Sequence, residues 1–272
     1  MGRRLPISVV MIARNEEQNL PRSLGSVCDW VEELIVVIND CEDGTALVAG
    51  EFGARVIEHP WISYVDQKNF AIKQANAPWV FSLDADEEVS QELRQQIAAA
   101  IDTIPEQVCG IRFPRLNRFL GRWMKHGDWY PDMLTRMFRN GSGRFTGTFI
   151  HEKLEVDGGL LTLSGDLLHY PYDSMRDQID KISHFANYFA AERILKKRRW
   201  RLSETLLRPF WRFFRAYVIR RGFLDGFPGF YLAVETAFST FARYGRLYEA
   251  ERLGVEIKEF PKLVESASEK AA

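Results

Sequence analysis

The sequence contains few cysteines and lacks the short motifs of the commonest nucleotide-binding enzymes. Its three cysteines, Cys28, Cys41 and Cys109, are widely spaced and form no C-x-x-C pair, which argues against a disulfide framework or a zinc site and for a reducing cytoplasm. Neither G-x-G-x-x-G after the first apolar run nor G-x-x-x-x-G-K-[ST] occurs, so a dinucleotide enzyme or a P-loop NTPase is disfavoured. No apolar run reaches about 18 residues, which disfavours a membrane-spanning helix.

Charge is unevenly distributed along the 272 residues. The net charge is −1, yet the segment 193–221 contains 11 lysines and arginines and a single acid, Glu204. The rest of the chain holds 25 basic and 36 acidic residues, a balance of −11. An acidic body opposes binding to nucleic acid, whereas a short basic segment suits an anionic surface.

Apolar runs alternate with helical patterns in the first hundred residues. Four strands are predicted there, at 7–12, 34–38, 54–57 and 79–83. Helices are predicted at 46–52 and 67–75, and Leu20, Leu24 and Val27 recur at helical spacing between the first two strands. Continuous β-branched runs are typical of strands buried on both faces, so this order predicts a parallel, doubly wound sheet. From about Cys109 the sequence becomes alternating and aromatic, which predicts antiparallel strands beside that sheet. After Asp173 the pattern is helical to about residue 250.

The most informative stretch is WVFSLDADEE, residues 79–88. Its apolar run ends abruptly in Asp84 and Asp86, which places two carboxylates on one side of an extended backbone. Ligands of open α/β sheets bind beyond the carboxyl ends of the strands. Carboxylate oxygens there suit Mg²⁺ or Mn²⁺, and such a metal could bind a diphosphate. The alternative is a solvated acidic turn that caps a helix starting near Ser90.

Seven segments in a fixed order carry a family resemblance. They are ISVVMIARNEE, ELIVVINDCEDGT, DQKNFAI, SLDADEE, HGDWYPD, FIHEKLEV and DLLHYPY. In this order they resemble family 2 glycosyltransferases of the GT-A fold, and more narrowly the bacterial branch that adds sugars to the lipopolysaccharide inner core, exemplified by β-1,4-glucosyltransferases. The resemblance implies an α/β catalytic domain at 1–172, with a nucleotide-binding half at 1–105 and an acceptor-side half at 106–172. A helical region at 173–272 would follow.

The implied reaction is the inverting transfer of a sugar from a nucleotide-sugar donor, a UDP-hexose, with a divalent metal, Mg²⁺ or Mn²⁺. The acceptor would be a cell-envelope glycan or glycolipid such as lipopolysaccharide core. One alternative is a nucleotidyltransferase on a similar fold, but it would need an early glycine-rich loop and RNEEQN has no glycine. The other alternative is a non-catalytic, membrane-associated nucleotide-sugar-binding protein. The presence of Asp84, Asp86 and two candidate catalytic acids argues against it.

The resemblance also assigns residues to the donor and the metal. The donor pocket would be lined by Ala13, Arg14, Asn15, Glu16, Asp40, Lys68, Asn69 and Asp84. The metal would be held by Asp84, Asp86 and His169, although Asp84 could contact the ribose and His169 could be a core histidine. The second strand departs from the common pattern, because Ile38 stands where an acid is usual. Asn39 or Asp40 would take its place.

Inversion requires a carboxylate that removes the proton of the acceptor hydroxyl, an effect of roughly 10²–10⁴ in rate. The two candidate catalytic residues are Asp132 in GDWYPD and Glu152 in FIHEKLEV. Glu152 is slightly favoured, because an acid between apolar strand residues needs a reason. Nearby, Arg136 and Arg139 could bind an acceptor phosphate, but a solvated face is the expectation for both.

The basic segment predicts an amphipathic helix that starts near Ser203. On a helical wheel four arginines form one stripe and five apolar residues lie opposite, namely Arg201, Arg208, Arg212 and Arg215 against Leu206, Phe210, Phe213, Phe214 and Tyr217. Further basic residues flank it at 196–199 and 220–221, as in an interfacial helix attracted to anionic lipid. The alternative is a helix packed on the catalytic domain with its arginines in water. We therefore expect a cytoplasmic protein, peripheral on the inner face of the membrane.

Overall fold

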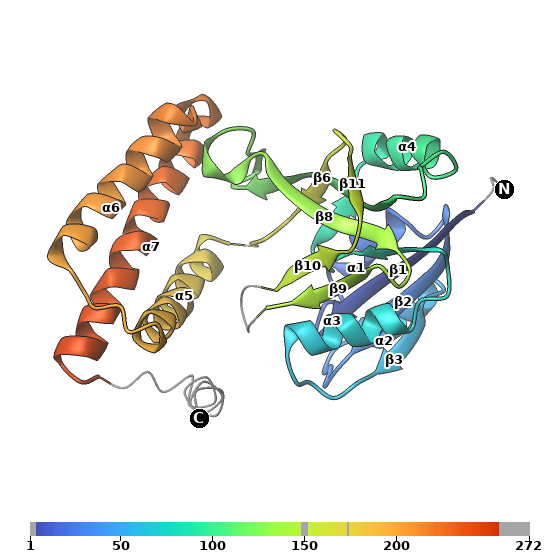
Figure 1. The fold of residues 1–272 in the computed structure, drawn as a ribbon, viewed down its shortest axis with the longest axis horizontal. Coiled ribbons are helices and arrows are strands. Elements are labelled where there is room, and N and C mark those ends of the chain that lie inside the picture. The colour runs from blue at the N-terminus through green and yellow to red at the C-terminus, as the bar shows by residue number, and fades with distance from the viewer. Residues whose placement is uncertain (1–3, 148–151, 173, 256–272) are drawn as a thin grey trace. The chain divides into compact units, whose positions relative to one another are not determined.

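The computed structural model describes residues 4–147, 152–172 and 174–255, which belong to two compact units (Figure 1). The first unit contains the chain up to Asn117 together with Pro131–Tyr170. The second contains Arg118–Tyr130 and the chain from Pro171 onward. Of the candidate residues, Glu152 is described, whereas the residues 148–151 just before it lie outside the described part of the chain.

The first half of the first unit is a parallel sheet with helices between its strands. The strands lie side by side in the order β3 (Arg55–Glu58), β2 (Val31–Ile38), β1 (Leu5–Ala13) and β4 (Trp79–Ser82). The connecting helices are α1 (Leu20–Gly25), α2 (Thr45–Glu51) and α3 (Tyr64–Lys73). The predicted doubly wound sheet is confirmed. Helix α3 begins three residues earlier than expected, because the Ser63 side chain caps it by accepting from the backbone N–H of Asp66.

The sheet continues through strands of both directions. Beyond β4 the order is β8 (Asp132–Arg139), β6 (Val108–Phe119), β12 (Leu167–His169) and β5 (Glu87–Val89). The pairs β4–β8 and β8–β6 are antiparallel, as predicted, whereas β12 and β11 (Gly159–Thr162) run parallel to β6. Strand β7 (Arg122–Trp123) also pairs with β6, and β9 (Gly143–Thr146) forms a separate hairpin with β10 (Lys153–Val156). The result is a mixed sheet.

Both faces of the sheet are covered, so the core has two parts. One face packs against α1, α2 and α4 (Gln91–Ala100), whose Leu24, Ala49 and Leu93 meet alternate residues of β1. The other face packs against α3, where Ala71 and Ile72 lie with residues of β2 and with Phe145 of β9. Ser90 caps α4 through its side chain, as predicted. This layering leaves the carboxyl ends of β1, β2 and β4 free for a site.

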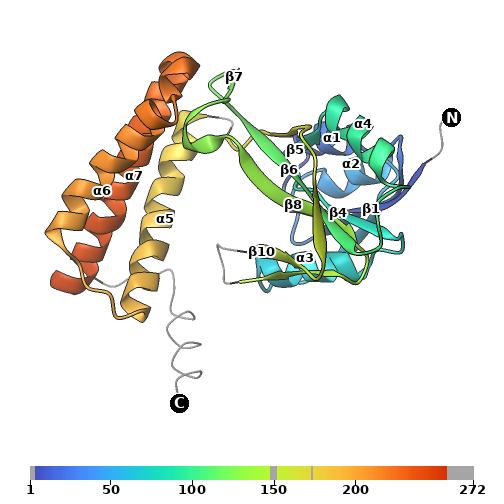
Figure 2. The same cartoon turned by 45° about the horizontal axis from the view of Figure 1, so that its top comes forward.

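The second unit is helical and consists mainly of α5 (Met175–Leu195), α6 (Leu202–Phe214) and α7 (Gly226–Arg252). Helices α6 and α7 lie side by side, with α5 also against α7 (Figure 2). A π turn at Arg215–Ile219 and a 3-10 turn at Gly222–Asp225 join α6 to α7. Among the described helices, none combines the length and the apolar character that crossing a membrane requires.

Candidate active site

Two loops that follow β1 and β2 are tied together at the carboxyl edge of the sheet. The backbone N–H of Glu16 donates to Thr45 Oγ1 across 2.8 Å, and that of Glu42 donates to Asn15 Oδ1 across 2.8 Å. Asn15 and Asp40 both adopt left-handed backbone conformations, with φ of 57° and 40°. Such conformations are uncommon outside glycine and concentrate at functional sites. The two loops therefore form one shaped edge.

The end of β2 presents an amide rather than an acid. Asn39 is buried, and its Nδ2 group has no hydrogen-bond partner among the described residues. A buried amide donor without a partner is costly unless a ligand or water satisfies it. Asp40, next in the chain, is exposed at the same edge. On the neighbouring β1 exit, Ala13 is buried and Arg14 is exposed.

Lys68 joins three parts of the site. It lies in the first half of α3 with only 6% of its surface exposed, and its Nζ is 3.0 Å from Asp84 Oδ1 and 3.4 Å from Glu152 Oε1. The neighbouring Asn69 is used differently, because its amide both donates to and accepts from the backbone of Phe145. Asn69 thereby fixes β9 to α3, and Lys68 alone of the two presents a charge to the carboxylates.

Arg136 is buried, which corrects the expectation of a solvated face. It is 7% exposed, and its NH2 group contacts Asp84 Oδ2 at 2.5 Å and Glu87 Oε1 at 2.8 Å. The pairing of β6 with β8 is irregular at this point, since Ile111 faces Met137 whereas Arg112 faces Thr135. The extra residue is Arg136, and such a bulge turns a side chain away from the normal alternation of a strand.

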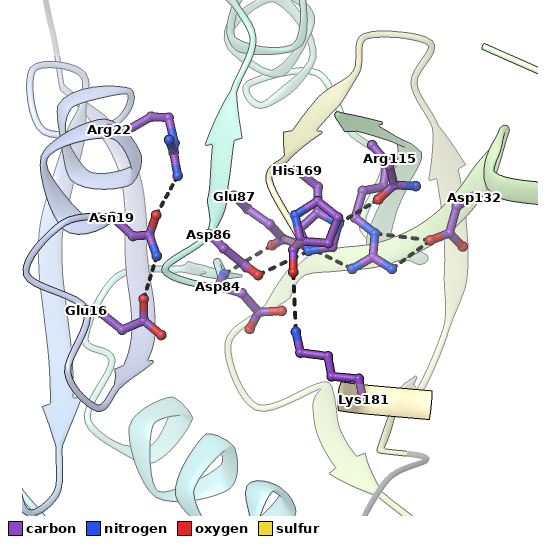
Figure 3. Close-up of polar contacts among 12 residues, drawn as sticks. Glu16, Asn19, Arg22, Asp84, Asp86, Glu87, Arg115, Asp132, His169 and Lys181 are labelled. Carbon is purple, nitrogen blue, oxygen red and sulfur yellow. Dashed lines mark hydrogen bonds and ion pairs between the residues drawn. The ribbon is translucent and has the colours of Figure 1, made fainter. Parts of the chain in front are cut away.

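Glu87 is the buried centre of a second set of contacts. It has no exposed surface, and besides Arg136 it accepts from the backbone N–H of Asp84 at 3.1 Å and lies 3.4 Å from Arg115 NH1. Arg115 in turn donates from Nε and NH2 to Asp132 Oδ2, at 3.1 and 2.8 Å (Figure 3). Asp132, one of the two candidate bases, is therefore held by a guanidinium.

These contacts form one row of charges of alternating sign. From one end to the other it runs through Glu152, Lys68, Asp84, Arg136, Glu87, Arg115 and Asp132. Burial alone would raise the pKa of Asp84, but the charges of Arg136 and Lys68 outweigh it and hold that pKa well below its ordinary value. Burial likewise opposes the charge of Arg136, yet Asp84 and Glu87 raise its pKa above its ordinary value. Both groups are therefore ionised at neutral pH.

Asp86 and His169 form a separate pair beside this row. Asp86 Oδ2 lies 3.2 Å from His169 Nε2, and Asn117 Oδ1 lies 2.6 Å from His169 Nδ1 (Figure 3). An amide oxygen only accepts, so Nδ1 carries a hydrogen and Nε2 is directed toward the carboxylate. An unprotonated Nε2 is an acceptor like the carboxylate, and two such acceptors suit a cation between them, with Asn117 orienting the imidazole.

Asp86 and His169 fit a divalent metal as two of its ligands, and the described residues do not supply the rest of the coordination shell. Among the described residues, no three side chains of His, Cys, Asp or Glu converge as a complete metal-binding group. Asp84 does not join the pair, because its two oxygens face Lys68 and Arg136. Mg²⁺ commonly takes one or two carboxylates and fills its other positions with water and substrate phosphate. Asp86 matches that pattern, and His169 adds one imidazole nitrogen beside it.

Comparison with known proteins agrees with this architecture. Residues 8–154 match the model of Glycosyl transferase family 2. The uncharacterized glycosyltransferase RP128 of Rickettsia prowazekii is 32% identical over 265 residues, covering 89% of this chain and 86% of that protein. The lipopolysaccharide core biosynthesis glycosyltransferase LpsC of Rhizobium meliloti is 26% identical over 257 residues, covering 92% and 94%.

Among solved structures, S. aureus TarS 1–349 in complex with UDP resembles the chain with 15% identity and a TM-score of 0.47, over 92% of each chain. The mixed sheet with its C-terminal helices is a GT-A fold, the fold that the sequence resemblance implied. The chain belongs to glycosyltransferase family 2, on the strength of the family model and of the relatives just described. It is a glycosyltransferase.

Some of the site was not visible in the sequence. Sequence pattern marks none of Glu87, Arg115 and Asn117 as a site residue and suggests at most an acceptor phosphate for Arg136. Each of the four nevertheless contacts a candidate residue. The acids of the DADEE stretch were a signal for Glu87, because an acid at the start of a buried strand needs a buried partner. No comparable signal marks Arg136, whose inward position depends on the bulge in β8.

Proposed function

We propose that the chain transfers a hexose, with inversion, from a UDP-hexose to a cell-envelope glycan or glycolipid such as lipopolysaccharide core. The observation that carries the proposal is the position of Lys68, a nearly buried cation at 3.0 Å from Asp84 and 3.4 Å from Glu152. A cation held between two carboxylates at the edge of a nucleotide-type sheet can meet the developing charge of a departing diphosphate. Membership of the family and the similarity to LpsC support the substrate classes.

The donor would lie over the edge formed by the loops after β1, β2 and β4. Asn39 has a free amide donor for the base, and Asn15 and Asp40 shape the pocket around it. Asp84 would hold Lys68 toward the diphosphate and accept from the ribose. Asp86 and His169 would hold Mg²⁺ or Mn²⁺, which when bound supplies a Lewis acid that neutralises phosphate charge.

The acceptor proton would pass to Glu152. Its only ion pair among the described residues is the 3.4 Å contact with Lys68, and about a quarter of its side chain is exposed. Asp132, by contrast, accepts two N–H groups of Arg115 on one oxygen. A carboxylate with fewer strong donors has more capacity to accept a proton. Glu152 therefore remains the favoured base, and Asp132 would position the acceptor side of the site through Arg115.

We also infer that the protein works at an anionic membrane surface. Three of the five apolar residues predicted for the stripe of α6 are exposed, namely Leu206, Phe210 (71%) and Phe214. Leu202, Leu207 and Trp211 are exposed beside them and extend the apolar stripe. The arginine stripe faces the other way, since Arg208 pairs with Glu204 and both Arg212 and Arg215 reach Asp128. A helix packed on the protein through its apolar stripe would show the reverse. Only Phe213 and Tyr217 pack inward, against Phe230.

Exposed basic residues flank this stripe at both ends of α6. They are Lys196, Lys197, Arg198 and Arg199 before it and Arg220 and Arg221 after it. Apolar residues that enter the acyl boundary, with cations at headgroup level, match the chemistry of an anionic lipid surface. Such a surface would bring the enzyme to a lipid-linked acceptor.

The experiment that tests the reaction uses purified full-length protein, a panel of nucleotide sugars and Mn²⁺ or Mg²⁺. We expect release of free UDP from one UDP-hexose, dependent on the metal and reduced at least 100-fold in Lys68→Met, because the variant loses the cation at the diphosphate. Leu47→Ser, an exposed residue of α2, is the matched control and should behave as the parent. If no UDP-hexose binds in calorimetry and none is turned over, the proposal is wrong.

A further inference from the structure

We propose that the helical unit contains a second binding site, for an anionic sugar, that is separate from the donor site. A cavity of about 190 Å³ lies among α5, α6, α7 and the segment around Trp129. All of its lining residues belong to the second unit, so the site does not depend on the placement of the first. The proposal rests on the proposed function in one respect, because it makes this sugar part of the acceptor.

Gln178 is the observation that points to a ligand. The side chain lines the cavity, is 2% exposed, and has no partner for either Nε2 or Oε1 among the described residues. A buried amide with both groups unpaired is unfavourable unless something polar enters the cavity. An amide offers one donor side and one acceptor side, which matches the hydroxyl groups of a sugar.

The charges around the cavity favour an anion. Arg212, Arg243 and Lys181 line it, against the single carboxylate of Glu235. Arg212 also reaches Asp128 at 3.5 Å, but Asp128 is shared with Arg215. The Nε of Arg243 has no hydrogen-bond partner among the described residues. The guanidinium groups of Arg243 and Arg212 present the forked donors that bind phosphate or carboxylate.

The shifts in pKa agree with this arrangement. Burial, and then the charge of Arg212, lower the pKa of Arg243, and Glu235 compensates only in part. Burial raises the pKa of Glu235, against the opposing charges of Arg243 and Arg212. The two guanidinium groups therefore repel each other across the cavity, and an anion between them would relieve that repulsion.

The remaining walls suit a sugar ring. Trp129 and Tyr172 line the cavity with ring centroids 6.2 Å apart, and Lys181 Nζ lies 4.6 Å from the centroid of the Tyr172 ring, so aromatic carbon and a cation together border the space for a sugar ring. Burial, and then the charge of Glu235, raise the pKa of Tyr172 to about 12, so its hydroxyl stays a donor. The volume is below the ~300–1,000 Å³ of pockets for drug-sized ligands. It therefore suits a single sugar residue that bears a phosphate or carboxylate.

The test is direct binding to the purified full chain, with glucose 6-phosphate, glucose and inorganic phosphate as probes in calorimetry. We expect glucose 6-phosphate to bind and both other probes to bind at least tenfold more weakly. Arg243→Gln should weaken glucose 6-phosphate at least tenfold. Gln178→Leu should weaken it as well, while leaving the melting temperature of the free protein unchanged or higher, because the variant removes an unpaired buried amide.

A donor-site variant separates this site from the nucleotide pocket. Asp86→Ala should bind glucose 6-phosphate as the parent does, and if it loses that binding while Arg243→Gln keeps it, the inference is overturned. The inference is also overturned if the parent protein does not bind glucose 6-phosphate. If the parent binds inorganic phosphate as tightly as glucose 6-phosphate, the site does not recognise a sugar. None of these measurements needs donor turnover, so a failure of the proposed transferase reaction would be seen separately, as parent protein that binds no UDP-hexose.

Discussion

Arg136 donates to Asp84 at 2.5 Å, although 52 positions separate the two residues in the sequence. The contact exists because β8 lies next to β4 and bulges at Arg136, which turns the guanidinium toward the loop that follows β4. The same guanidinium group is 2.8 Å from Glu87, so one buried cation serves two carboxylates. Asp84 is thus positioned by the strand pairing, and Lys68 is positioned by Asp84 in turn.

Replacement of Arg136 by methionine should destabilise the protein strongly. The variant keeps the volume of the side chain but leaves the fully buried Glu87 without its closest cation, a change that costs about 3–5 kcal/mol. The measurement is urea unfolding followed by tryptophan fluorescence. Arg112→Met on the adjacent strand is the control, because Arg112 is exposed and its side chain donates to Thr162 Oγ1 at the surface, and the variant should stay within about 0.5 kcal/mol of the parent. Equal effects of the two substitutions would refute the role given to Arg136.

Replacement of Glu152 by glutamine should lower kcat for transfer by roughly 10²–10⁴, with little change in KM for the donor. The amide keeps the shape of the side chain and loses the ability to accept a proton. Asp132→Asn should reduce kcat less, because Arg115 already occupies one of its oxygens. The measurement is initial rates for both variants over a range of pH, where Glu152→Gln should also lose the acidic limb of the profile. The reverse order of the two variants would assign the base to Asp132.

Replacement of Asn117 by leucine should weaken Mn²⁺ binding by about 10–100-fold, because the imidazole of His169 loses the group that fixes its tautomer and orientation. Calorimetry of Mn²⁺ in the presence of UDP measures this without turnover. Asn140→Ala is the control, since its amide donates to the backbone of Ala75 and Ala77 and touches neither Asp86 nor His169. Unchanged Mn²⁺ affinity in Asn117→Leu would show that His169 is not a ligand.

The sequence predicted the elements better than the contacts between them. The strands of the parallel half are visible because 7–12 and 34–38 are continuous β-branched and apolar runs, which only a doubly covered sheet can bury. The position of Asp84 and Asp86 followed from the abrupt end of such a run. Contacts between residues far apart in the sequence are harder to predict, because they depend on the register in which two strands pair.

His169 and Arg136 illustrate the difference. His169 meets Asp86 because β12 pairs with β5 in a register that sets His169 opposite Glu87, and nothing local in DLLHYPY specifies that register. A solvated face is the expectation from sequence for Arg136, and a one-residue bulge turns its side chain inward instead. Local pattern therefore located the loops of the site, whereas strand pairing selected which charges meet there.

The stability of the protein should fall as the pH drops below about 4, in part because of Glu33 on β2. Partial burial would raise its pKa, but hydrogen bonds from Ser8, Asn76 and Arg55 outweigh burial and hold the pKa below its ordinary value. The unfolded chain therefore binds a proton at a higher pH than the folded chain does. The stabilisation is complete above the unfolded value of about 4.3 and is lost as the pH falls through the folded value.

The measurement for Glu33 is the urea midpoint at several values between pH 6 and pH 3. Glu33→Gln should show a smaller loss of stability over the acidic part of this range than the parent. Glu32→Gln is a matched control, because Glu32 is its exposed neighbour on the same strand. If both substitutions leave the acid dependence unchanged, the network around Glu33 contributes nothing to it.

The apolar stripe of α6 should bind anionic vesicles. Phe210 and Trp211 are exposed members of that stripe, and burial of each side chain in the lipid boundary contributes about 1.5–3 kcal/mol. The double variant Phe210→Ser with Trp211→Ser should therefore reduce co-sedimentation with vesicles that contain phosphatidylglycerol by at least tenfold, and Leu47→Ser in the first unit should not. Binding should weaken in raised salt and with purely zwitterionic vesicles, because the flanking basic residues interact with headgroup charge. Equal binding by the double variant and the parent would exclude α6 as the contact, and self-association that the double variant abolishes would identify a second copy of the chain, not lipid, as the occupant of the stripe.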